Sequence, residues 1–440
     1  MMSITTREQA IEFLYGRIDY ERMSASLSAS DFKLDRMRNL LQQIGNPQTH
    51  IPVVHIAGTK GKGSTATMIA SILKAAGYRV GLFTSPHLEQ FEERVRVDGA
   101  MIDESGLIEL VEQLSHATHQ IDAATDGLNP TFFELTTALA WLYFRREQVD
   151  IAVLEVGLGG RLDSTNVCQP EVCVLTTISR DHMHILGSRL ADIAAEKAGV
   201  IKPGIPVVSG VESVEADRVI RQVASQQDAP LTYVDDDSAS SLVDQWAQTA
   251  GGSETTDRAS VMLSGKHQRR NAAIAVCAAK VLRQRGWRLG DEAIHAGLAL
   301  AHCPVRVEVV GRSPLVVLDA AHNWASAGAL LESIQEFDVP GRRVLIFATS
   351  RDKDVSGLLR RLTGGFDSVV LTQFQSNPRA MPLAQLQVVA ARVNTLPTHA
   401  AATPADAWNA ARKICPEDGL ICVAGSFFLA AELREVGMMS

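Results

Sequence analysis

The feature that most constrains the fold is a series of short apolar runs separated by stretches with helical spacing. The runs are nearly continuous rather than alternating, which is typical of strands buried on both faces of a parallel sheet. They occupy residues 53–56, 80–83, 151–154, 172–175 and 206–208. Residues 65–76 place apolar side chains on one helical face and are followed by Gly77, a helix stop signal. The pattern predicts an α/β fold with a doubly wound sheet.

A second strand–helix series follows residue 303. Its apolar runs are residues 315–318, 344–347, 369–371 and 421–424. Before it, a polar stretch at 235–254 is predicted to form loops around weak strands, and 269–283 to form a helix. We therefore expect two domains, a large one with a phosphate loop over residues 1–302 and a smaller Rossmann-like α/β domain over residues 303–440.

Composition excludes several classes of protein. The net charge is 42 − 50 = −8 with no basic run, so no nucleic-acid partner is expected. No apolar stretch approaches the roughly 20 residues of a membrane span, and the N-terminus lacks the apolar core of a signal peptide. The six cysteines have neither CxxC spacing nor neighbouring histidines that suggest zinc, so free thiols in a cytoplasmic protein are predicted.

The strongest local motif is IAGTKGKGST at residues 56–65, placed between a predicted strand and a predicted helix. Glycines let backbone amides approach phosphate oxygens, the helix N-terminus favours an anion, and Lys62 supplies a point charge. The motif departs from the strict GxxxxGK[ST] pattern, and a glycine-rich turn without a ligand would also explain it. The combination of glycines, lysines and hydroxyls favours phosphate binding.

Three other predicted strands end in groups suited to a hard cation. Ser85, Glu155 and His182 each follow or close an apolar run. Ligands collect at the carboxyl ends of strands in open α/β sheets, so these groups could hold Mg²⁺ beside nucleotide phosphates. Singly, each has a structural explanation: a turn, a strand-end carboxylate and a hydrogen-bonded core residue.

Residues 193–202, IAAEKAGVIK, form a further segment of interest. Their spacing is typical of an amphipathic helix with a solvated lysine, ended by glycine. The residues alone predict no function for it.

A set of longer motifs carries a family resemblance. They are GTKGKGST, TSPHLEQFEERV, FFELTTALA, EVGLGGRLDSTN, DHMHILG, AAEKAGVIKPG, GKHQRRNA and LDAAHN. In this order they resemble the folylpolyglutamate synthases and dihydrofolate synthases, members of the Mur-type superfamily of ATP-dependent amide ligases. The resemblance runs from about residue 20 to AGSFFLAAELR near the C-terminus.

The resemblance implies roles by position. ATP would be bound by Lys60, Gly61, Lys62, Gly63, Ser64 and Asn271, with Arg306 and Asp319 from the second domain. Magnesium, with two ions expected, would be bound by Ser85, Glu155, His182 and Lys197, the last as a carbamate formed from CO₂. Catalysis would involve Lys62, Lys197 and His322. The pterin would contact Thr131, Phe132, Phe133, Glu134, Leu162, Asp163 and Ser164, although core and turn packing explains these segments nearly as well.

The chain departs from the family pattern at a few positions. Lys60 stands where many bacterial members have asparagine, and Val305 takes a usual glycine position before Arg306. Residues 179–180 replace a more usual apolar residue before Asp181. Trp324 stands where proline is common, which predicts a differently shaped helix start.

We therefore expect a monomeric, ATP-dependent ligase that adds L-glutamate to dihydropteroate, to reduced folates or to both, through an acyl phosphate. The alternatives are a monofunctional folylpolyglutamate synthase, a Mur-type ligase for another carboxylate, and a P-loop kinase or NTPase. A non-catalytic binding protein is the least favoured, because every proposed ligand position is filled. A kinase would leave the AAEKAG segment and the second domain unexplained.

Overall fold

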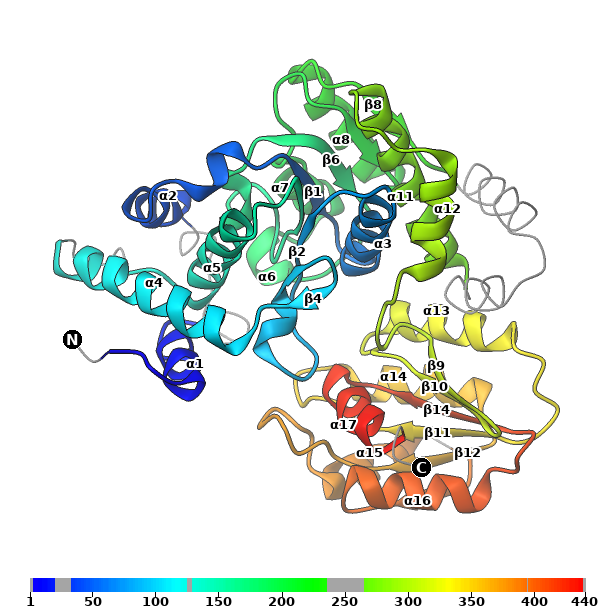
Figure 1. Ribbon diagram of the computed structural model, residues 1–440. Helices are drawn as coiled ribbons and strands as arrows, with labels where there is room; N and C mark the ends of the chain where they lie inside the picture. Colours follow the sequence, from blue (N-terminus) through cyan, green and yellow to red (C-terminus); the bar gives the residue numbers. More distant parts are fainter. Residues whose placement is uncertain (1–2, 20–32, 125–128, 236–264, 394, 438–440) are drawn as a thin grey trace. The chain divides into compact units, whose positions relative to one another are not determined.

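The computed structural model describes residues 3–19, 33–124, 129–235, 265–393 and 395–437. They form two compact units (Figure 1). The first contains the described residues up to Asp235 together with Arg270–Ala301. The second contains residues 265–269 and the described residues from His302 onward. Each unit has its own sheet.

The first unit is built on an eight-stranded sheet in the order β4-β3-β2-β5-β1-β6-β7-β8. Strands β2, β5, β1, β6, β7 and β8 run parallel to one another, while β3 and β4 add an antiparallel edge next to β2. The strands are β1 (Val53–Ala57), β2 (Val80–Phe83), β3 (Val95–Val97), β4 (Ala100–Met101), β5 (Ile151–Glu155), β6 (Pro170–Leu175), β7 (Val207–Ser209) and β8 (Leu231–Tyr233). The carboxyl ends of β1, β2, β5 and β6 therefore share one edge.

Helices pack against this sheet, and two of the apolar cores that they form lie in the described residues. One core joins α1, α2, α4 and α5 to the sheet, and the other joins α7 and α8 to β6 and β7. Helix α5 packs closely on β2, because a Cβ atom at Gly81 would lie 2.7 Å from the Phe144 ring. The helices are α1 (Arg7–Tyr15), α2 (Leu34–Gln43), α3 (Lys62–Ala75), α4 (Glu104–Ala124), α5 (Phe132–Arg146), α6 (Met183–Leu186), α7 (Leu190–Ala198), α8 (Val214–Gln226), α11 (Lys266–Gln284) and α12 (Asp291–Leu300).

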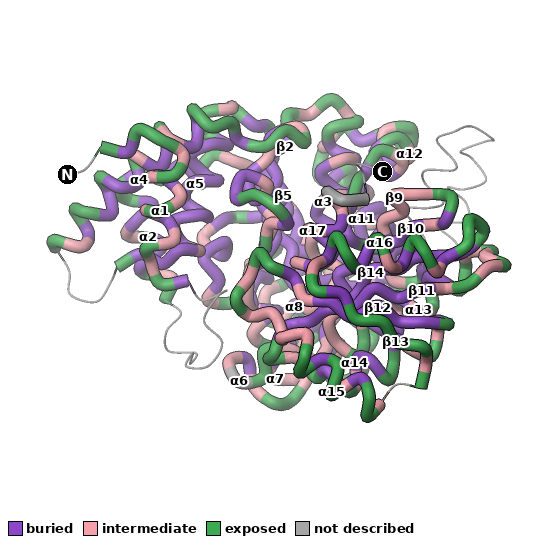
Figure 2. The backbone as a smooth tube through the Cα atoms, turned by 90° about the horizontal axis from the view of Figure 1, so that it is seen from below, coloured by how far each residue is buried: buried purple, intermediate pink, exposed green. Residues whose placement is uncertain are grey.

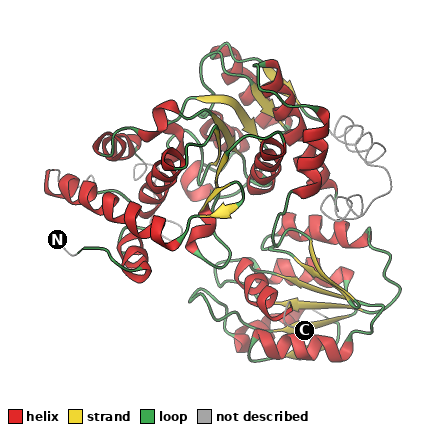
Figure 3. Cartoon of the chain, viewed as in Figure 1, coloured by secondary structure: helices red, strands yellow, loops and turns green. Residues whose placement is uncertain are grey.

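The second unit has a six-stranded sheet in the order β13-β12-β11-β14-β10-β9, in which only β9 runs antiparallel to its neighbour. Figure 3 shows helices packed around its strands. Helices α13, α14 and α15 contact one another in sequence, and α16 packs on α17 and on β11 and β12. The elements are β9 (Glu308–Arg312), β10 (Leu315–Leu318), α13 (Trp324–Gln335), β11 (Arg343–Phe347), α14 (Val355–Leu362), β12 (Ser368–Leu371), α15 (Leu383–Val393), β13 (Thr398–Ala400), α16 (Pro404–Ile414), β14 (Leu420–Ala424) and α17 (Phe427–Gly437).

The predicted α/β class and every predicted apolar strand are confirmed. The central strands run through buried chain in Figure 2, as a parallel sheet covered on both faces requires. The sequence missed β3, β4, β8, β9 and β13. Strand β3 has two buried valines separated by Arg96, and the other four are short strands whose residues are partly or wholly exposed, so none forms a continuous apolar run. The predicted loops at 235–254 lie outside the described residues, apart from Asp235.

A single domain boundary at residue 302 does not fully describe the two units, because a short earlier segment also belongs to the second unit. The first turn of α11 belongs to the second unit, because Arg269 forms a bidentate ion pair with Glu336 of that unit. All six cysteines are free thiols, and five of them are buried. None of the helices in the described ranges has the length and apolar character needed to cross a membrane.

Candidate active site

The loop between β1 and α3 has the geometry of a phosphate loop. Gly58 and Gly61 have φ values of 151° and 83°, which L-residues rarely adopt. A Cβ atom would lie 1.9 Å from Thr176 Oγ1 at Gly58 and 2.3 Å from Asn271 Oδ1 at Gly61. Glycine is therefore required at both positions for steric as well as conformational reasons. Gly61 caps the N-terminus of α3, the positive end of the helix dipole.

The residues after β6 hold this loop in place. The Thr59 amide donates to the Thr177 carbonyl at 2.6 Å, and the Lys60 amide donates to Thr177 Oγ1 at 3.2 Å. Thr176 Oγ1 donates to the Lys60 carbonyl at 2.7 Å. Sequence reasoning missed these two threonines, although they directly follow a predicted strand end.

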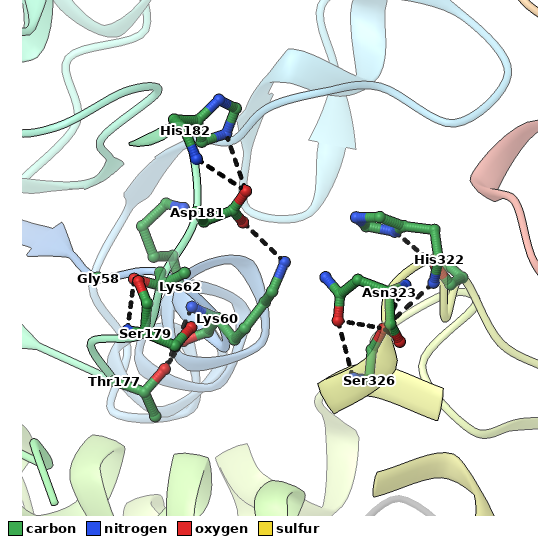
Figure 4. A network of polar contacts seen from close by, with 12 residues as sticks. Gly58, Lys60, Lys62, Thr177, Ser179, Asp181, His182, His322, Asn323 and Ser326 are labelled. Atoms are coloured by element: carbon green, nitrogen blue, oxygen red, sulfur yellow. Dashed lines mark hydrogen bonds and ion pairs between the residues drawn. The ribbon is translucent and has the colours of Figure 1, made fainter. Parts of the chain in front are cut away.

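Two lysines of the loop face carboxylates; Figure 4 shows the first pair, Lys60 with Asp181. Lys60 Nζ lies 3.0 Å from Asp181 Oδ2, and Lys62 Nζ lies 3.8 Å from Glu155 Oε1. The Lys62 side chain is 16% exposed and that of Lys60 is 36% exposed, so Lys62 is the more enclosed charge. Asp181 was not predicted as a site residue, but its pairing with Lys60 places it at the edge of the loop.

The structure brings two of the three predicted strand-end ligands into contact. The Ser85 amide donates to Glu155 Oε2 at 3.2 Å, and the Glu155 carboxylate is buried. His182 instead contacts its neighbour: its amide donates to Asp181 Oδ1 at 3.1 Å, and its Nε2 lies 3.8 Å from the same oxygen. The His182 side chain is 53% exposed, but desolvation of its ring, together with the charges of Lys197, Lys62 and Lys60, lowers its pKa to about 4. The ring is therefore neutral at pH 7, as a metal-ligating imidazole must be.

The donor types at this edge suit magnesium. Within the described ranges there is no group of three or more His, Cys, Asp and Glu side chains placed to hold a metal ion. Magnesium does not need one, since it is commonly bound by one or two carboxylates with substrate phosphates and water. Glu155 supplies the carboxylate, and a Cβ atom at Gly63 would lie only 3.3 Å from its Oε2, so the carboxylate sits directly against the loop.

Lys197 is buried, so the sequence-based expectation of a solvated lysine in an amphipathic helix is wrong. It lies in the last turn of α7, where its Nζ donates to the Gly58 carbonyl at 2.8 Å. Burial, reinforced by the nearby charge of Lys62, lowers the pKa of Lys197 to about 7. A substantial fraction of the amine is therefore neutral and nucleophilic at physiological pH.

The second unit presents Arg306 on a tightly held segment. Val305 and Val307, on either side of it, have φ values of 49° and 52°. The Val305 amide donates to Glu308 Oε2 and the Val307 amide to Asp319 Oδ2, each at 2.8 Å. Asp319 Oδ1 accepts from the Ala321 amide, so both carboxylate oxygens of this predicted ATP contact already accept hydrogen bonds from backbone amides. Burial raises the pKa of Asp319 to about 6, against the lowering effect of Arg306.

His322 lies just before α13, in the same unit. Its Nδ1 is 2.8 Å from the Ala320 carbonyl, which only accepts, so Nδ1 carries a proton and donates (Figure 4). Asn323 caps α13 in a reciprocal capping box with Ser326. Trp324 is the first residue of α13 and 54% exposed, with the Arg361 guanidinium 5.2 Å above its ring. The start of α13 is thus an ordinary capped helix.

Comparison with protein families identifies two domains in the chain. Residues 56–279 match the Mur ligase middle domain, and residues 305–427 match the Mur ligase glutamate ligase domain. The dihydrofolate synthase/folylpolyglutamate synthase of Bacillus subtilis is 40% identical over 75% of this chain and 78% of its own length. The folylpolyglutamate synthase of Lacticaseibacillus casei is 37% identical over 91% of this chain and 93% of its own length.

The chain belongs to the folylpolyglutamate synthase/dihydrofolate synthase family of Mur ligases. Solved structures of the family agree. Mycobacterium tuberculosis folylpolyglutamate synthase complexed with ADP matches with a TM-score of 0.82 and 30% identity, covering 99% of both chains. Escherichia coli FolC in complex with DHPP and ADP matches with a TM-score of 0.81 and 29% identity, covering 99% of this chain and 98% of that one. The expectation of a ligase of this family is confirmed.

Within this ligase fold, the predicted pterin segment Thr131–Glu134 is occupied by structural contacts. Thr131 caps α5 in a capping box with Glu134, and Arg36 Nε donates to Glu134 Oε1 at 3.0 Å. Phe132 is buried and stacks on Tyr15 with ring centroids 4.8 Å apart. The described contacts of Glu134 thus support the packing explanation that the sequence left open.

The second predicted pterin segment, residues 162–164, is mixed in character. Asp163 is buried and accepts hydrogen bonds from Leu158 and Thr165, while Ser164 Oγ is 2.6 Å from Thr137 Oγ1. Leu162 differs, because it lines a surface pocket. The other lining residues are Leu158, Gly159, Gly160, Ile185, Leu186 and Glu196. Leu162 is therefore partly exposed at the surface, whereas Asp163 shapes the loop.

Proposed function

We propose that this ligase joins the amine of L-glutamate to a carboxylate of dihydropteroate and of reduced folates, with ATP as the energy source. The observation that carries the proposal is the enclosed phosphate loop, where Lys62, Glu155 and Lys197 gather at one edge of the first sheet. The paired name of the Bacillus subtilis relative supports the use of both acceptors.

The ATP phosphates are assigned to the loop and to the N-terminus of α3. Five loop residues would surround them: Lys60, Gly61, Lys62, Gly63 and Ser64. Asn271 would contact ATP beside Gly61. Arg306, which lies in the second domain on the segment held by Asp319, would also contact ATP. We accordingly assign ATP binding to a domain over residues 1–302 and glutamate ligation to a domain over residues 303–440. A monomeric, cytoplasmic enzyme remains our expectation.

Magnesium is assigned to Ser85, Glu155 and His182, together with a carbamate on Lys197. Bound there, the metal would supply positive charge to the phosphate oxygens during phosphoryl transfer. The carbamate would form when the neutral Lys197 amine attacks CO₂ and loses a proton, which the lowered pKa favours. A carbamate is an anion, so it would turn a buried amine into an oxygen ligand.

The reaction would proceed in two balanced steps. A carboxylate oxygen of the acceptor attacks the γ-phosphorus of ATP, the bond to the β-phosphate oxygen breaks, and ADP leaves. The glutamate amine then attacks the acyl carbon, the bond from that carbon to the phosphate oxygen breaks, and the amine loses a proton. Lys62 would neutralise charge on the transferring group. His322, protonated on Nδ1, would present the lone pair of Nε2 to the second step.

The acceptor would lie along the loop after β5, with Leu162 in contact and Asp163 and Ser164 shaping the loop. Thr131, Phe132, Phe133 and Glu134 would support this region from α5. A monofunctional folylpolyglutamate synthase is the second candidate, since the Lacticaseibacillus casei relative, which this chain matches over 91% of its length, has that single name.

The decisive experiment is ADP release by the purified protein with ATP, Mg²⁺, L-glutamate and either dihydropteroate or tetrahydrofolate. Release that requires both the acceptor and glutamate is expected with each acceptor. Release that persists when either is omitted would contradict the ligase. Turnover on tetrahydrofolate alone would favour the monofunctional enzyme.

A further inference from the structure

A chain of buried polar groups links the strand before the phosphate loop to the loop after β5. His55, in the middle of β1, has no exposed surface, and its Nε2 lies 2.8 Å from Thr165 Oγ1. Thr165 Oγ1 in turn lies 2.5 Å from Asp163 Oδ1. Both Thr165 and Asp163 are buried. The chain therefore runs from the sheet into the segment 157–166 that carries Leu162.

The direction of these hydrogen bonds follows from their chemistry. The Leu158 and Thr165 amides donate to Asp163, at 2.9 Å and 3.0 Å, as expected for a carboxylate acceptor. The Thr165 hydroxyl then donates its single proton to Asp163, so it must accept from His55. Nε2 of His55 therefore carries a proton. Burial, with a contribution from Lys202, lowers the pKa of His55 to about 3, so the ring is neutral and Nδ1 has none.

An apolar residue would fill this position at lower cost. The neighbours of His55 in β1 are Val54 and Ile56, both fully buried. In the part of the chain that the structure describes, Nδ1 of His55 is a buried atom with no hydrogen-bond partner. Burying a polar atom without a partner is unfavourable, so the ring must provide something that packing does not. What it provides is one directed donor to Thr165.

The segment that this network shapes also packs on the end of α7. A Cβ atom at Gly160 would lie 2.9 Å from the carbonyl oxygens of both Glu196 and Lys197. Asn166 Nδ2 donates to the Arg161 carbonyl at 2.9 Å and to the Gly199 carbonyl at 3.0 Å. The segment is therefore packed closely against the last turn of α7, next to the pocket that Leu162 lines.

We propose that His55 is a positioning residue for the acceptor substrate: through Thr165 it holds Asp163, and through Asp163 the pocket-lining loop, in the binding conformation. The inference rests on the proposed function for the identity of the acceptor. It goes beyond that function by assigning a role to a strand residue with no direct access to substrate.

The network predicts an effect on one substrate only. The phosphate loop is held by Thr176 and Thr177, which do not belong to the His55 chain. Loss of the His55 donor should therefore raise the KM for the acceptor and leave the KM for ATP near its original value. A general loss of stability would not separate the two substrates.

Three variants test the role. His55→Phe keeps a ring and removes the donor, and we expect about a tenfold rise in the KM for dihydropteroate. His55→Gln restores an N–H donor, and its KM should return to within about threefold of wild type. Val54→Ala removes buried volume from the same strand without touching the network, so it should lower Tm and leave the acceptor KM unchanged.

Thr165→Val provides a test that does not depend on folding of a strand variant. It should raise the acceptor KM as His55→Phe does, and the double variant should be no worse than the worse single one. An unchanged acceptor KM in both single variants would overturn the proposal. An equal rise in the KM for ATP and the KM for the acceptor would also overturn it. So would an acceptor KM that is the same for His55→Gln and His55→Phe.

Amide hydrogen exchange separates this proposal from the proposed function. The Leu158 and Thr165 amides should exchange faster in His55→Phe than in wild type, because Asp163 is no longer held. This result is expected even if wild type uses another acceptor, in which case the ADP-release assay fails and the exchange result stands. Unchanged exchange across 157–166 in a folded His55→Phe protein would contradict the positioning role.

Discussion

Two segments that we assign to ATP binding adopt left-handed backbone by different means. The phosphate loop of the first unit uses glycine, at Gly58 and Gly61. The Arg306 segment of the second unit uses Val305 and Val307, with φ values of 49° and 52°. Positive φ in a β-branched residue is a true outlier, because Cβ crowds the backbone. The glycine-containing phosphate loop avoids backbone strain, whereas the Arg306 segment contains it.

The groups that hold the two segments differ in kind. A buried amine, Lys197, donates to the Gly58 carbonyl. Two carboxylates, Asp319 and Glu308, accept the amides of Val307 and Val305. Such strain costs about 1–3 kcal/mol per residue. Hydrogen bonds to charged groups contribute about 1.5–3 kcal/mol each and can offset it. A strained segment thus needs anchors that a glycine loop does not.

The largest expected effect comes from removing the buried cation. Lys197→Met should abolish ligation and yet stabilise the protein at pH 7. The pKa of Lys197 is about 7 in the folded protein, against 10.5 for an ordinary lysine, so the unfolded state binds the proton more tightly. The stability of the wild type therefore rises as the pH is raised from about 7 to 10.5. Below that window the buried amine costs up to about 5 kcal/mol, which chemical denaturation of wild type and variant should reveal.

Lys413→Met, at an exposed lysine of α16, is the control and should change neither activity nor stability appreciably. A Lys197→Met protein that still ligates at a near-normal rate would remove the carbamate role.

Removing the buried anion should have the next largest effect, with the opposite dependence on pH. The pKa of Asp319 is raised from 3.8 to about 6, so the folded state binds the proton more tightly and stability falls as pH rises from about 4 to 6. The change amounts to about 3 kcal/mol. Asp319→Asn cannot titrate, so the difference in unfolding free energy between wild type and variant should vary by that amount across the window. Parallel pH profiles would show that Asp319 titrates normally.

A pair of glycine variants separates conformation from crowding in the first unit. Gly77 has a φ of 89°, and a Cβ atom there would have no other atom within 4 Å, whereas a Cβ atom at Gly61 would lie 2.3 Å from Asn271 Oδ1. Gly77→Ala should cost about 1 kcal/mol of strain. Gly61→Ala should cost about 2 kcal/mol more, from crowding, and should also slow ADP release. Equal Tm shifts for the two variants would show that Asn271 moves aside freely.

The smallest effect measures the strain in the second segment directly. Val305→Ala and Val305→Gly both remove the buried side chain, but only glycine relaxes the φ of 49°. In ordinary extended or helical backbone glycine is less stable than alanine by about 0.5–1 kcal/mol. Here Val305→Gly should be the more stable of the two, by about 1 kcal/mol. Thermal unfolding of both proteins measures the order, and the ordinary order would mean that the segment is unstrained.

Most of the fold could be predicted from the sequence because buried parallel strands are continuous apolar runs. The phosphate loop was equally readable, since glycines and lysines at a strand–helix junction have few other uses. The edge strands could not be read in this way, because exposed strands have no such run. Lys197 was misread as solvated: its burial depends on Gly160 and Gly199, which let the loop after β5 pack closely on α7.

The roles of single polar residues were the least predictable. Motifs marked Glu134 and Asp163 as substrate contacts, but both carboxylates hold backbone amides in the structure. His55 attracted no notice, since one polar residue inside an apolar strand forms no motif. Val305 stands at a usual glycine position of the family, which is a sequence sign of its positive φ, whereas nothing local distinguishes Val307 from an ordinary strand valine.

The sequence by itself determined the α/β class, the positions of the main strands along the chain and the position of the phosphate loop. These depend on hydrophobic period and on glycine, which act over a few neighbouring residues. Only the tertiary structure decided which charges are buried, which carboxylates support backbone and where strain is held. Those properties depend on contacts between residues far apart in the chain, such as Lys197 with Gly58 and His55 with Thr165. Burial then shifts the pKa values and fixes the hydrogen-bond directions on which the proposed chemistry rests.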